Sequence, residues 1–280
     1  TFGSGAEYAE FVDLNKLGAV VTKGVANVPW PGNPTPRVAE VYGGMLNAVG
    51  LQNPGIDLFV ERDIPFLKQF DTKIMVNVCG HSTEEYIEVV ERLSDQPVDL
   101  LEINISCPNV KEGGIAFGQD PKAVEAITKE MKKHAAQPVI MKLSPNVTDI
   151  TEMARAAEAG GADGLSLINT ITGMKIDINR QKFVLANKTG GMSGPAIHPV
   201  AVRMVYQTAQ AVRLPIVGMG GIMNAEDAIE MILAGATAVS VGTANFTNPH
   251  VTEEIVAGIR DYMERYQVAD IRDLVGAVHE

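Results

Sequence analysis

The sequence predicts an α/β protein, a (β/α)8 or TIM barrel, that forms a single domain over residues 1–280. Short runs of continuous apolar residues recur along the chain, segments with helical periodicity separate them, and no linker or shift in composition divides the sequence. Continuous apolarity indicates strands that are buried on both faces, as in a parallel sheet. The runs occupy residues 19–25, 74–78, 100–105, 139–143, 164–168, 216–219 and 238–241.

Signals for helix ends lie between these runs. Ser82 and Glu85 form a capping box before an apolar stripe with helical spacing. The alanine-rich segment 153–159 predicts a helix that ends at Gly160. Two further helices are expected to begin at Asp120-Pro121 and at Asn224, the second running to Gly235.

The chain contains seven such runs, whereas a closed barrel of this type has eight strands. Residues 1–5 resemble a loop that follows a strand, so we expect the first barrel strand to be missing from this chain and the barrel to be open on one side. The Pro- and Gly-rich segment 26–55 is expected to be a long loop on the catalytic face.

Composition excludes several functions. With 46% hydrophobic and 20% charged residues, the chain has enough apolar surface for a large core. A net charge of -11 disfavours binding to nucleic acids and to anionic membranes. No apolar stretch approaches the roughly 20 residues of a membrane span, and no signal peptide opens the chain, so we expect a cytoplasmic protein.

A chain-bound metal is not expected. The two cysteines, Cys79 and Cys107, lack CxxC spacing, and the five histidines form no HxxxH pair. We expect Cys79 to be a packing residue.

Three clusters of glycine predict a phosphate site near the last strands. Glycines let backbone N–H groups approach an anion, and the helix that begins at Asn224 would add positive potential. For each glycine the alternative is relief of a turn. The clusters are Gly190, Gly191 and Gly194, then Gly218, Gly220 and Gly221, then Gly242 with Thr243.

Lysines and asparagines predict a second binding region at other strand ends. Lys23 and Lys142 each lie near the end of an apolar run. A lone lysine is usually a solvated surface group, but at two strand ends we expect these lysines to emerge at the barrel mouth and to pair with anionic groups. Carboxamides offer donors and acceptors that suit a planar heterocycle, although asparagine is also a common turn residue. The asparagines concerned are Asn47, Asn77, Asn104, Asn109 and Asn169.

Cys107 follows the apolar run 100–105 within the segment NISCPN. A lone cysteine is usually a small buried hydrophobe, but its polar neighbours favour a functional thiol. Since no histidine or Ser/His/Asp set accompanies it, general-base chemistry fits better than nucleophilic acyl transfer.

Seven segments together resemble the dihydroorotate dehydrogenases over nearly the whole chain. They are LNAVGLQNPG (46–55), NISCPN (104–109), MKLSPN (141–146), LINT (167–170), GGMSGPA (190–196), GMGGI (218–222) and VGTANF (241–246). Cys107 resembles the base of class 1 enzymes, where class 2 has serine, and the stretches NPTPRVAE and KEGGIAFG resemble class 1B. That class implies a cytoplasmic enzyme of pyrimidine (UMP) biosynthesis that forms a homodimer. It also implies a heterotetramer with a subunit that carries FAD and a [2Fe-2S] cluster and reduces NAD.

The resemblance implies FMN-dependent oxidation of (S)-dihydroorotate to orotate. Cys107 would remove a proton from C5 while hydride leaves C6 for N5 of FMN. Residues expected to bind FMN are Lys23, Gly24, Asn77, Asn104, Lys142, Ile168, Gly194, Gly220, Gly221, Gly242 and Thr243. Residues expected to bind the substrate are Lys23, Asn47, Ala48, Val49, Gly50, Leu51, Asn104, Asn169 and Thr170.

The sequence departs from the family pattern at one place, and two alternative functions stay open. Family members carry a strand ending in Ala-Ser-Gly before the TFGSG-like stretch. Without that strand we expect this chain to bind FMN poorly or not at all. A lyase or isomerase acting on a sugar phosphate would use the same phosphate site, but would need a carboxylate or Schiff-base lysine at the mouth. A non-catalytic binding or scaffold subunit is the other alternative, and fumarate is the other candidate electron acceptor.

Overall fold

The computed structural model describes residues 2–106 and 115–279, and within them seven parallel strands form one sheet. Each strand lies in or overlaps one predicted apolar run, so the predicted fold class is confirmed. Ala19 and Ala238, from the two edge strands, line one shared cavity, which means that the sheet curls into a nearly closed barrel. In sheet order the strands are β1 (Ala19–Val21), β4 (Lys73–Val78), β5 (Leu100–Asn104), β6 (Val139–Lys142), β7 (Gly164–Leu167), β12 (Ile216–Met219) and β13 (Ala238–Ser240).

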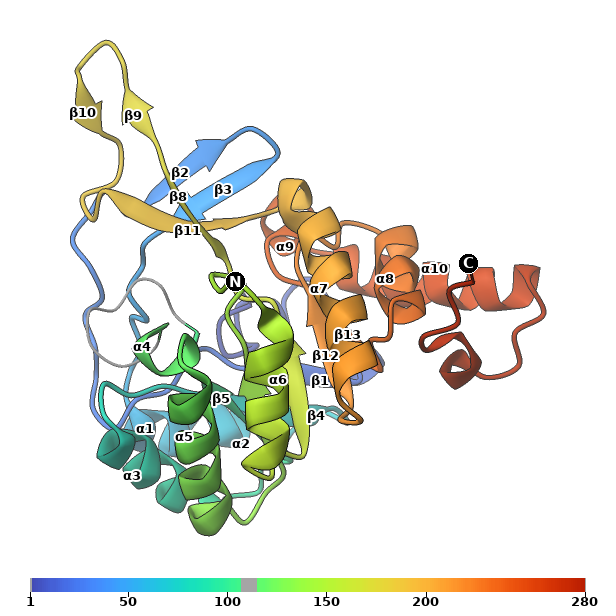
Figure 1. The fold of residues 1–280 in the computed structure, drawn as a ribbon, viewed down its shortest axis with the longest axis horizontal. Coiled ribbons are helices and arrows are strands. Elements are labelled where there is room, and N and C mark those ends of the chain that lie inside the picture. Colours follow the sequence, from blue (N-terminus) through green and yellow to red (C-terminus); the bar gives the residue numbers. More distant parts are fainter. Residues whose placement is uncertain (1, 107–114, 280) are drawn as a thin grey trace.

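Helices follow the strands and cover the outside of the barrel (Figure 1). Each of the long helices contacts the next one in the chain, as expected when strand and helix alternate. They are α3 (Thr83–Ser94), α5 (Pro121–His134), α6 (Ile150–Ala159), α7 (His198–Ala211), α8 (Ala225–Leu233) and α10 (Val251–Arg265). Among the described residues, no helix combines the length and apolarity needed to cross a membrane.

The predicted helix starts are confirmed. The Ser82 hydroxyl accepts the N–H of Glu85 at 3.4 Å, while the Glu85 carboxylate accepts the N–H of His81 at 2.7 Å, one residue before the usual capping-box partner. Asp120 caps α5, and Asn224 caps α8 through the N–H of Asp227 at 3.0 Å.

The predicted end of α6 at Gly160 is also confirmed, but Gly160 itself keeps a helical conformation, with φ -73°. Gly161 takes the left-handed conformation instead, with φ +89°. A Cβ atom at Gly160 would lie 2.5 Å from Cβ of Thr128 in α5. Glycine is therefore required at position 160 because the two helices approach closely there.

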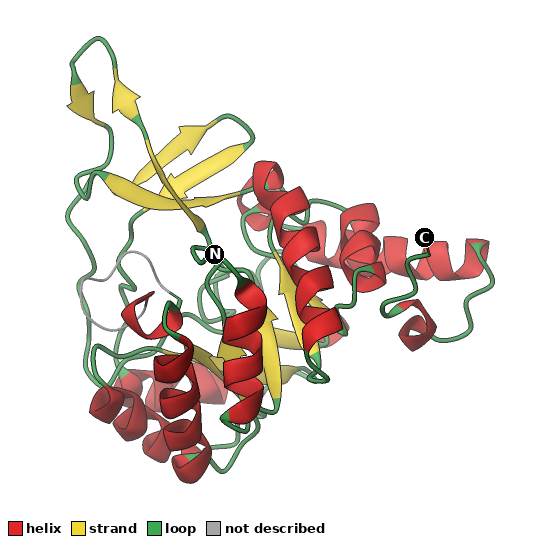
Figure 2. Cartoon of the chain, viewed as in Figure 1, coloured by secondary structure: helices red, strands yellow, loops and turns green. Residues whose placement is uncertain are grey.

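A second, smaller sheet covers one end of the barrel, and the sequence did not predict it. Segment 26–55, expected to be a loop, contains two of its strands, and the glycine cluster near residue 190 contributes a third. Its order is β2 (Val38–Val41), β3 (Gly44–Asn47), β11 (Thr189–Ser193) and β8 (Ile171–Met174). A hairpin of β9 (Ile176–Asp177) and β10 (Lys182–Phe183) extends beyond this sheet, away from the helices (Figure 2).

Short helical turns complete the described chain. They are η1 (Leu14–Lys16), α1 (Ile56–Leu58), the π-helical η2 (Phe59–Asp63), α2 (Ile64–Leu67), α4 (Ile115–Gly118), η3 (Pro195–Ile197), α9 (Ala244–Thr247) and η4 (Ile271–Leu274). One apolar cluster extends from Val12 to Ile255. The single-domain organisation over residues 1–280 stays a prediction.

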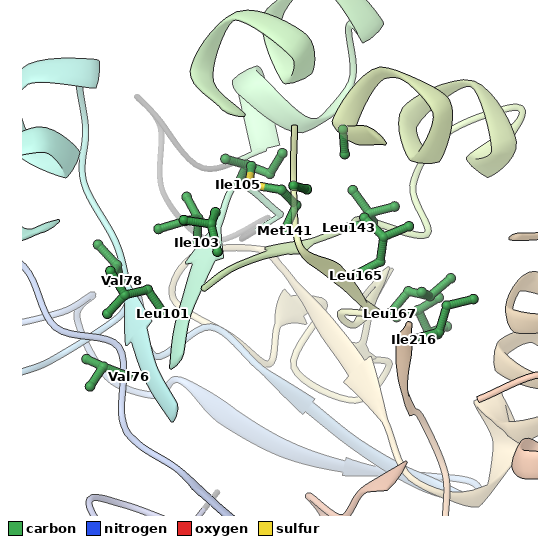
Figure 3. Packing of buried hydrophobic residues seen from close by; sticks show 14 of the residues in the cluster. Val76, Val78, Leu101, Ile103, Ile105, Met141, Leu143, Leu165, Leu167 and Ile216 are labelled. Atoms are coloured by element: carbon green, nitrogen blue, oxygen red, sulfur yellow. The ribbon is translucent and has the colours of Figure 1, made fainter. Parts of the chain in front are cut away.

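Alternation along the strands separates the apolar core from the barrel interior. Val76 and Val78 of β4 and Leu101 of β5 belong to the core that lies between strands and helices (Figure 3). Met75 and Asn77, at the intervening positions of β4, line the interior cavity instead. Because successive side chains of a strand point to opposite faces, the apolar positions fix which polar residues face inward.

Replacement of Leu101 by alanine should lower the free energy of unfolding by about 2–5 kcal/mol, because Leu101 is fully buried and its neighbours can only partly fill the space. Urea unfolding measures this loss. Leu58→Ala is the matched control, since Leu58 is 39% exposed and should lose far less. Equal losses in the two variants would contradict the assigned core.

Candidate active site

The carboxyl ends of the parallel strands bring polar side chains together at one mouth of the barrel. Asn77 of β4 pairs in register with Glu102 of β5, and Asn104 of β5 pairs with Lys142 of β6. Neighbouring positions in a sheet lie roughly 5 Å apart. Segments far apart in the sequence therefore contribute side chains to one site.

Asn77, Asn104 and Lys142 line a cavity of about 780 Å³, a size suited to a cofactor and a small substrate. Nearly all the residues predicted to bind the cofactor or substrate line it. They are Lys23, Gly24, Asn47, Val49, Gly50, Leu51, Asn77, Asn104, Lys142, Ile168, Asn169, Thr170, Gly194, Gly220, Gly221, Gly242 and Thr243. Their binding roles stay predictions.

Three predicted residues differ from this group. Ala48 is fully buried in a small cluster with Ala39, Leu46 and Leu185, so its side chain packs inside the protein and does not line the cavity. Cys107, the predicted base, lies outside the described residues, as does Asn109. Cys79 is buried beside Ala26 and Trp30, as expected for a packing residue.

The cavity ends at a glycine-rich cradle near the last two barrel strands. Gly220 and Gly221 have φ of +130° and +69°. A Cβ atom at Gly221 would lie 2.8 Å from the carbonyl oxygen of Gly194. The Thr243 hydroxyl donates to the Ser193 hydroxyl at 2.7 Å and joins the end of β13 to the end of β11. Close backbone approach of this kind suits a phosphate group.

The beginning of helix α8 contributes less to this site than its position in the sequence suggested. The Asn224 and Asp227 side chains accept the N–H groups of Asp227 and Met223, at 3.0 and 2.8 Å. Glu226 and Asp227 also place negative charge in the first turn. The glycine loops, more than this helix end, would therefore bind an anion.

Gly190 and Gly191, expected in the phosphate site, lie within strand β11 and do not line the cavity. A Cβ atom at Gly191 would lie 1.9 Å from the Thr170 hydroxyl oxygen. Asn47, opposite Gly191 in the small sheet, donates to the Gly191 carbonyl at 3.5 Å. These glycines allow the small sheet to approach the barrel mouth.

His198 contacts the glycine cradle but does not line the cavity. It is 7% exposed, its Nδ1 lies 2.9 Å from the Gly220 carbonyl oxygen, and its Nε2 lies 3.1 Å from a Glu230 carboxylate oxygen. With Asp227, these side chains form a group of three potential metal ligands within 4.8 Å of one another. The expectation that the chain binds no metal stays a prediction.

Sequence reasoning missed two fully buried polar residues, Glu102 and Ser106. One Glu102 oxygen accepts from Lys142 Nζ at 3.2 Å and also from the Asn77 amide. Ser106 contacts Asn104 and Asn169. A signal was available for Glu102, since an acidic residue inside an apolar strand run must be paired.

The dihydroorotate dehydrogenase family matches residues 1–263 of this sequence. The chain belongs to this family. Among curated relatives, the dihydroorotate dehydrogenase B (NAD(+)) catalytic subunit of Lachnoclostridium phytofermentans is 73% identical over 278 residues, which are 99% of this chain and 93% of that protein. The subunits of the same name from Alkaliphilus metalliredigens and Caldicellulosiruptor bescii are 64% and 53% identical, covering 99% and 100% of this chain and 92% and 93% of their own.

The expected resemblance to class 1B catalytic subunits is therefore confirmed. Membership of the family implies a flavin cofactor, and the cavity fits one. The glycine cradle offers backbone donors where any side chain would fill the space. At the other end, a Cβ atom at Gly24 would lie 3.0 Å from the Asn77 amide oxygen, so glycine keeps the region beside Asn77 open for a flat ring.

Proposed function

We propose that this protein oxidises (S)-dihydroorotate to orotate with FMN, a step of pyrimidine biosynthesis. The observation that carries the proposal is that four asparagines and the glycine cradle line one cavity. The four, the asparagine group, are Asn47, Asn77, Asn104 and Asn169. Similarity to relatives named dihydroorotate dehydrogenase B over nearly their full length supports the same reaction.

In this proposal the glycine cradle and Thr243 hold the phosphate of FMN, while Lys23, Asn77 and Lys142 hold the region of its ring. FMN, when bound, supplies the hydride acceptor for C6 of dihydroorotate. The chain binds and orients the substrate through Asn47, Asn104, Asn169, Thr170 and the backbone of segment 49–51. The small sheet, whose strand β3 carries Asn47, would exclude water from the mouth.

Cys107 is the proposed general base that removes the proton from C5. Its neighbours in sequence, Asn104 and Ser106, are described and lie in the hydrogen-bonded group at the end of β5. In the sequence, Cys107 follows Ser106 directly and lies three positions after Asn104, a proposed substrate ligand, and this adjacency supports its role. A base needs hydrogen-bond reach to the proton that it removes.

We also propose a homodimer and a complex with a subunit that carries FAD and a [2Fe-2S] cluster and reduces NAD. The relatives are named catalytic subunits, which implies another subunit in those enzymes. Exposed apolar side chains on the small sheet and its hairpin support a protein interface on this chain. They include Val38, Tyr42, Met174, Ile176, Ile178 and Phe183. A cytoplasmic location also stays a prediction.

Orotate formation from dihydroorotate, assayed with excess FMN and with NAD, fumarate or a dye as acceptor, tests this function. We expect dye-dependent turnover by the chain alone, and NAD-dependent turnover once an iron–sulfur and FAD subunit is added. Fumarate-dependent turnover without that subunit would contradict the proposed acceptor. A colourless protein that cleaves or isomerises a sugar phosphate, or a bound flavin that substrate does not bleach, would refute the dehydrogenase.

A further inference from the structure

One buried carboxylate contacts the asparagine group but does not itself line the cavity. Glu102 is 0% exposed and lies between Leu101 and Ile103 in strand β5. One of its oxygens accepts from Lys142 Nζ at 3.2 Å and from Asn77 Nδ2, while the other has no hydrogen-bond partner among the described residues. A buried charge is costly unless it is paired, so its presence here requires a reason.

The hydrogen bonds that lead away from Glu102 form a chain with a single direction. Asn104 Nδ2 donates to Asn77 Oδ1 at 3.2 Å, and the Ser106 hydroxyl donates to Asn104 Oδ1 at 3.0 Å. Asn169 Nδ2 then donates to the Ser106 hydroxyl oxygen at 2.8 Å. Each donor group points along the chain toward Glu102.

The direction of this hydrogen-bond chain follows from the chemistry of Glu102, its first member. An ionised carboxylate only accepts hydrogen bonds, so Asn77 must turn its nitrogen toward Glu102 and its oxygen toward Asn104. That oxygen requires a donor, which orients the Asn104 amide in turn. The same requirement orients Ser106 and then Asn169, whose own oxygen accepts the N–H of Thr170 at 2.7 Å.

The consequence concerns the amide hydrogen atoms of the asparagines that this hydrogen-bond chain does not use. A carboxamide nitrogen carries two N–H groups, and the chain uses one from each of Asn77, Asn104 and Asn169, whose oxygens are already occupied. All three side chains line the cavity. Among the described residues nothing else uses their remaining N–H groups, so these three asparagines offer N–H donors to a ligand.

We propose that Glu102 is a positioning residue that sets the direction of the Asn77–Asn104–Ser106–Asn169 chain, so that the cavity selects ligands rich in carbonyl and carboxylate oxygens. The inference rests on the proposed function, because orotate and dihydroorotate carry one carboxylate and two ring carbonyls. Glu102 does not contact the ligand in this scheme. It acts through Asn77 and Lys142.

Replacement of Glu102 by glutamine keeps the shape of the side chain but gives it one acceptor and one donor group. Asn77 is then no longer forced to turn its nitrogen toward position 102. We expect the orotate Kd, measured from the change in flavin absorbance with FMN in excess, to rise at least tenfold, which corresponds to about 1.4 kcal/mol. KM for dihydroorotate should rise more than kcat falls.

Asp63→Asn is the matched control. Asp63 is also a buried carboxylate, 5% exposed and paired with Arg62 at 2.7 Å, but it does not line the cavity. Among the described residues its side-chain hydrogen bonds are with Arg62 and not with Asn77, Asn104 or Asn169. We expect it to lower stability to urea while the orotate Kd stays unchanged. Equal Kd values for Glu102→Gln and the unmodified protein would refute the positioning role, as would an equal rise in Asp63→Asn.

A neutron structure of the unmodified protein tests the direction without any variant. We expect deuterium on Asn77 Nδ2 facing Glu102 and on Asn104 Nδ2 facing Asn77. A proton on Glu102, or Asn77 Oδ1 facing it, would overturn the inference even if the enzyme oxidises dihydroorotate. Conversely, an unmodified protein that never forms orotate would refute the proposed function, whereas the neutron result would stand by itself.

Discussion

Replacement of Cys107 by alanine should reduce turnover of dihydroorotate by about 10²–10⁴-fold, the usual contribution of a positioned general base. FMN affinity should be retained, because all the residues expected to hold the cofactor except Asn104 come from other segments of the barrel. Steady-state orotate formation and FMN titration measure the two properties separately. Unchanged turnover in this variant would remove Cys107 from the mechanism.

Two further variants sharpen this test. Cys107→Ser should recover part of the lost activity at high pH, because a hydroxyl deprotonates much less readily than a thiol, whose ordinary pKa is about 8.5. Cys79→Ala is the control for loss of a cysteine. Cys79 is fully buried against Ala26 and Trp30, so its replacement should lower stability and leave turnover intact. A loss of turnover as large as that of Cys107→Ala would point to a structural effect.

The barrel was predictable because its strands are buried on both faces. A strand such as β5 is buried at nearly every position and mostly apolar, so the run 100–105 could be recognised without any partner strand. The polar residues that end such runs were equally visible. Parallel strands place their carboxyl ends at one mouth, so Asn77, Asn104 and Lys142 could be assigned to one site.

The small sheet was not predictable in the same way. Its strands β3 and β11 pair across more than a hundred residues of sequence, and β11 begins with Thr189, Gly190 and Gly191, a composition typical of a turn. Glycine at positions 190 and 191 allows strand β11 to lie close to Asn47 and Thr170, and only folding brings these residues together. Long-range contacts of this kind leave no local periodicity in the sequence.

Glu102 illustrates a different limit of prediction from the sequence. The expectation that a charge in an apolar strand must be paired was applied to Lys142, and the structure supplies Glu102 as its partner at 3.2 Å. The same expectation applied to Glu102 would have identified the pair from the sequence. The direction of the asparagine chain, however, depends on which side chains meet, and no spacing in the sequence contains that information.

Replacement of Gly221 by alanine should weaken FMN binding by on the order of a hundredfold, or about 2.7 kcal/mol. At φ +69° the new Cβ atom would lie 2.8 Å from the Gly194 carbonyl oxygen and 2.8 Å from the backbone nitrogen of His198. Neither backbone atom can move without shifting the cradle. Quenching of flavin fluorescence on titration with FMN measures the change.

Gly276→Ala separates this effect from the cost of the backbone conformation. Gly276 has the same φ of +69°, but a Cβ atom there would have no neighbour within 4 Å, and the residue does not line the cavity. Both variants carry the strain of a left-handed alanine, about 1–2 kcal/mol. Only Gly221→Ala should also lose affinity for FMN, because only there does the side chain displace the backbone that would hold the phosphate. Equal FMN affinities in the two variants would show that the cradle binds something else.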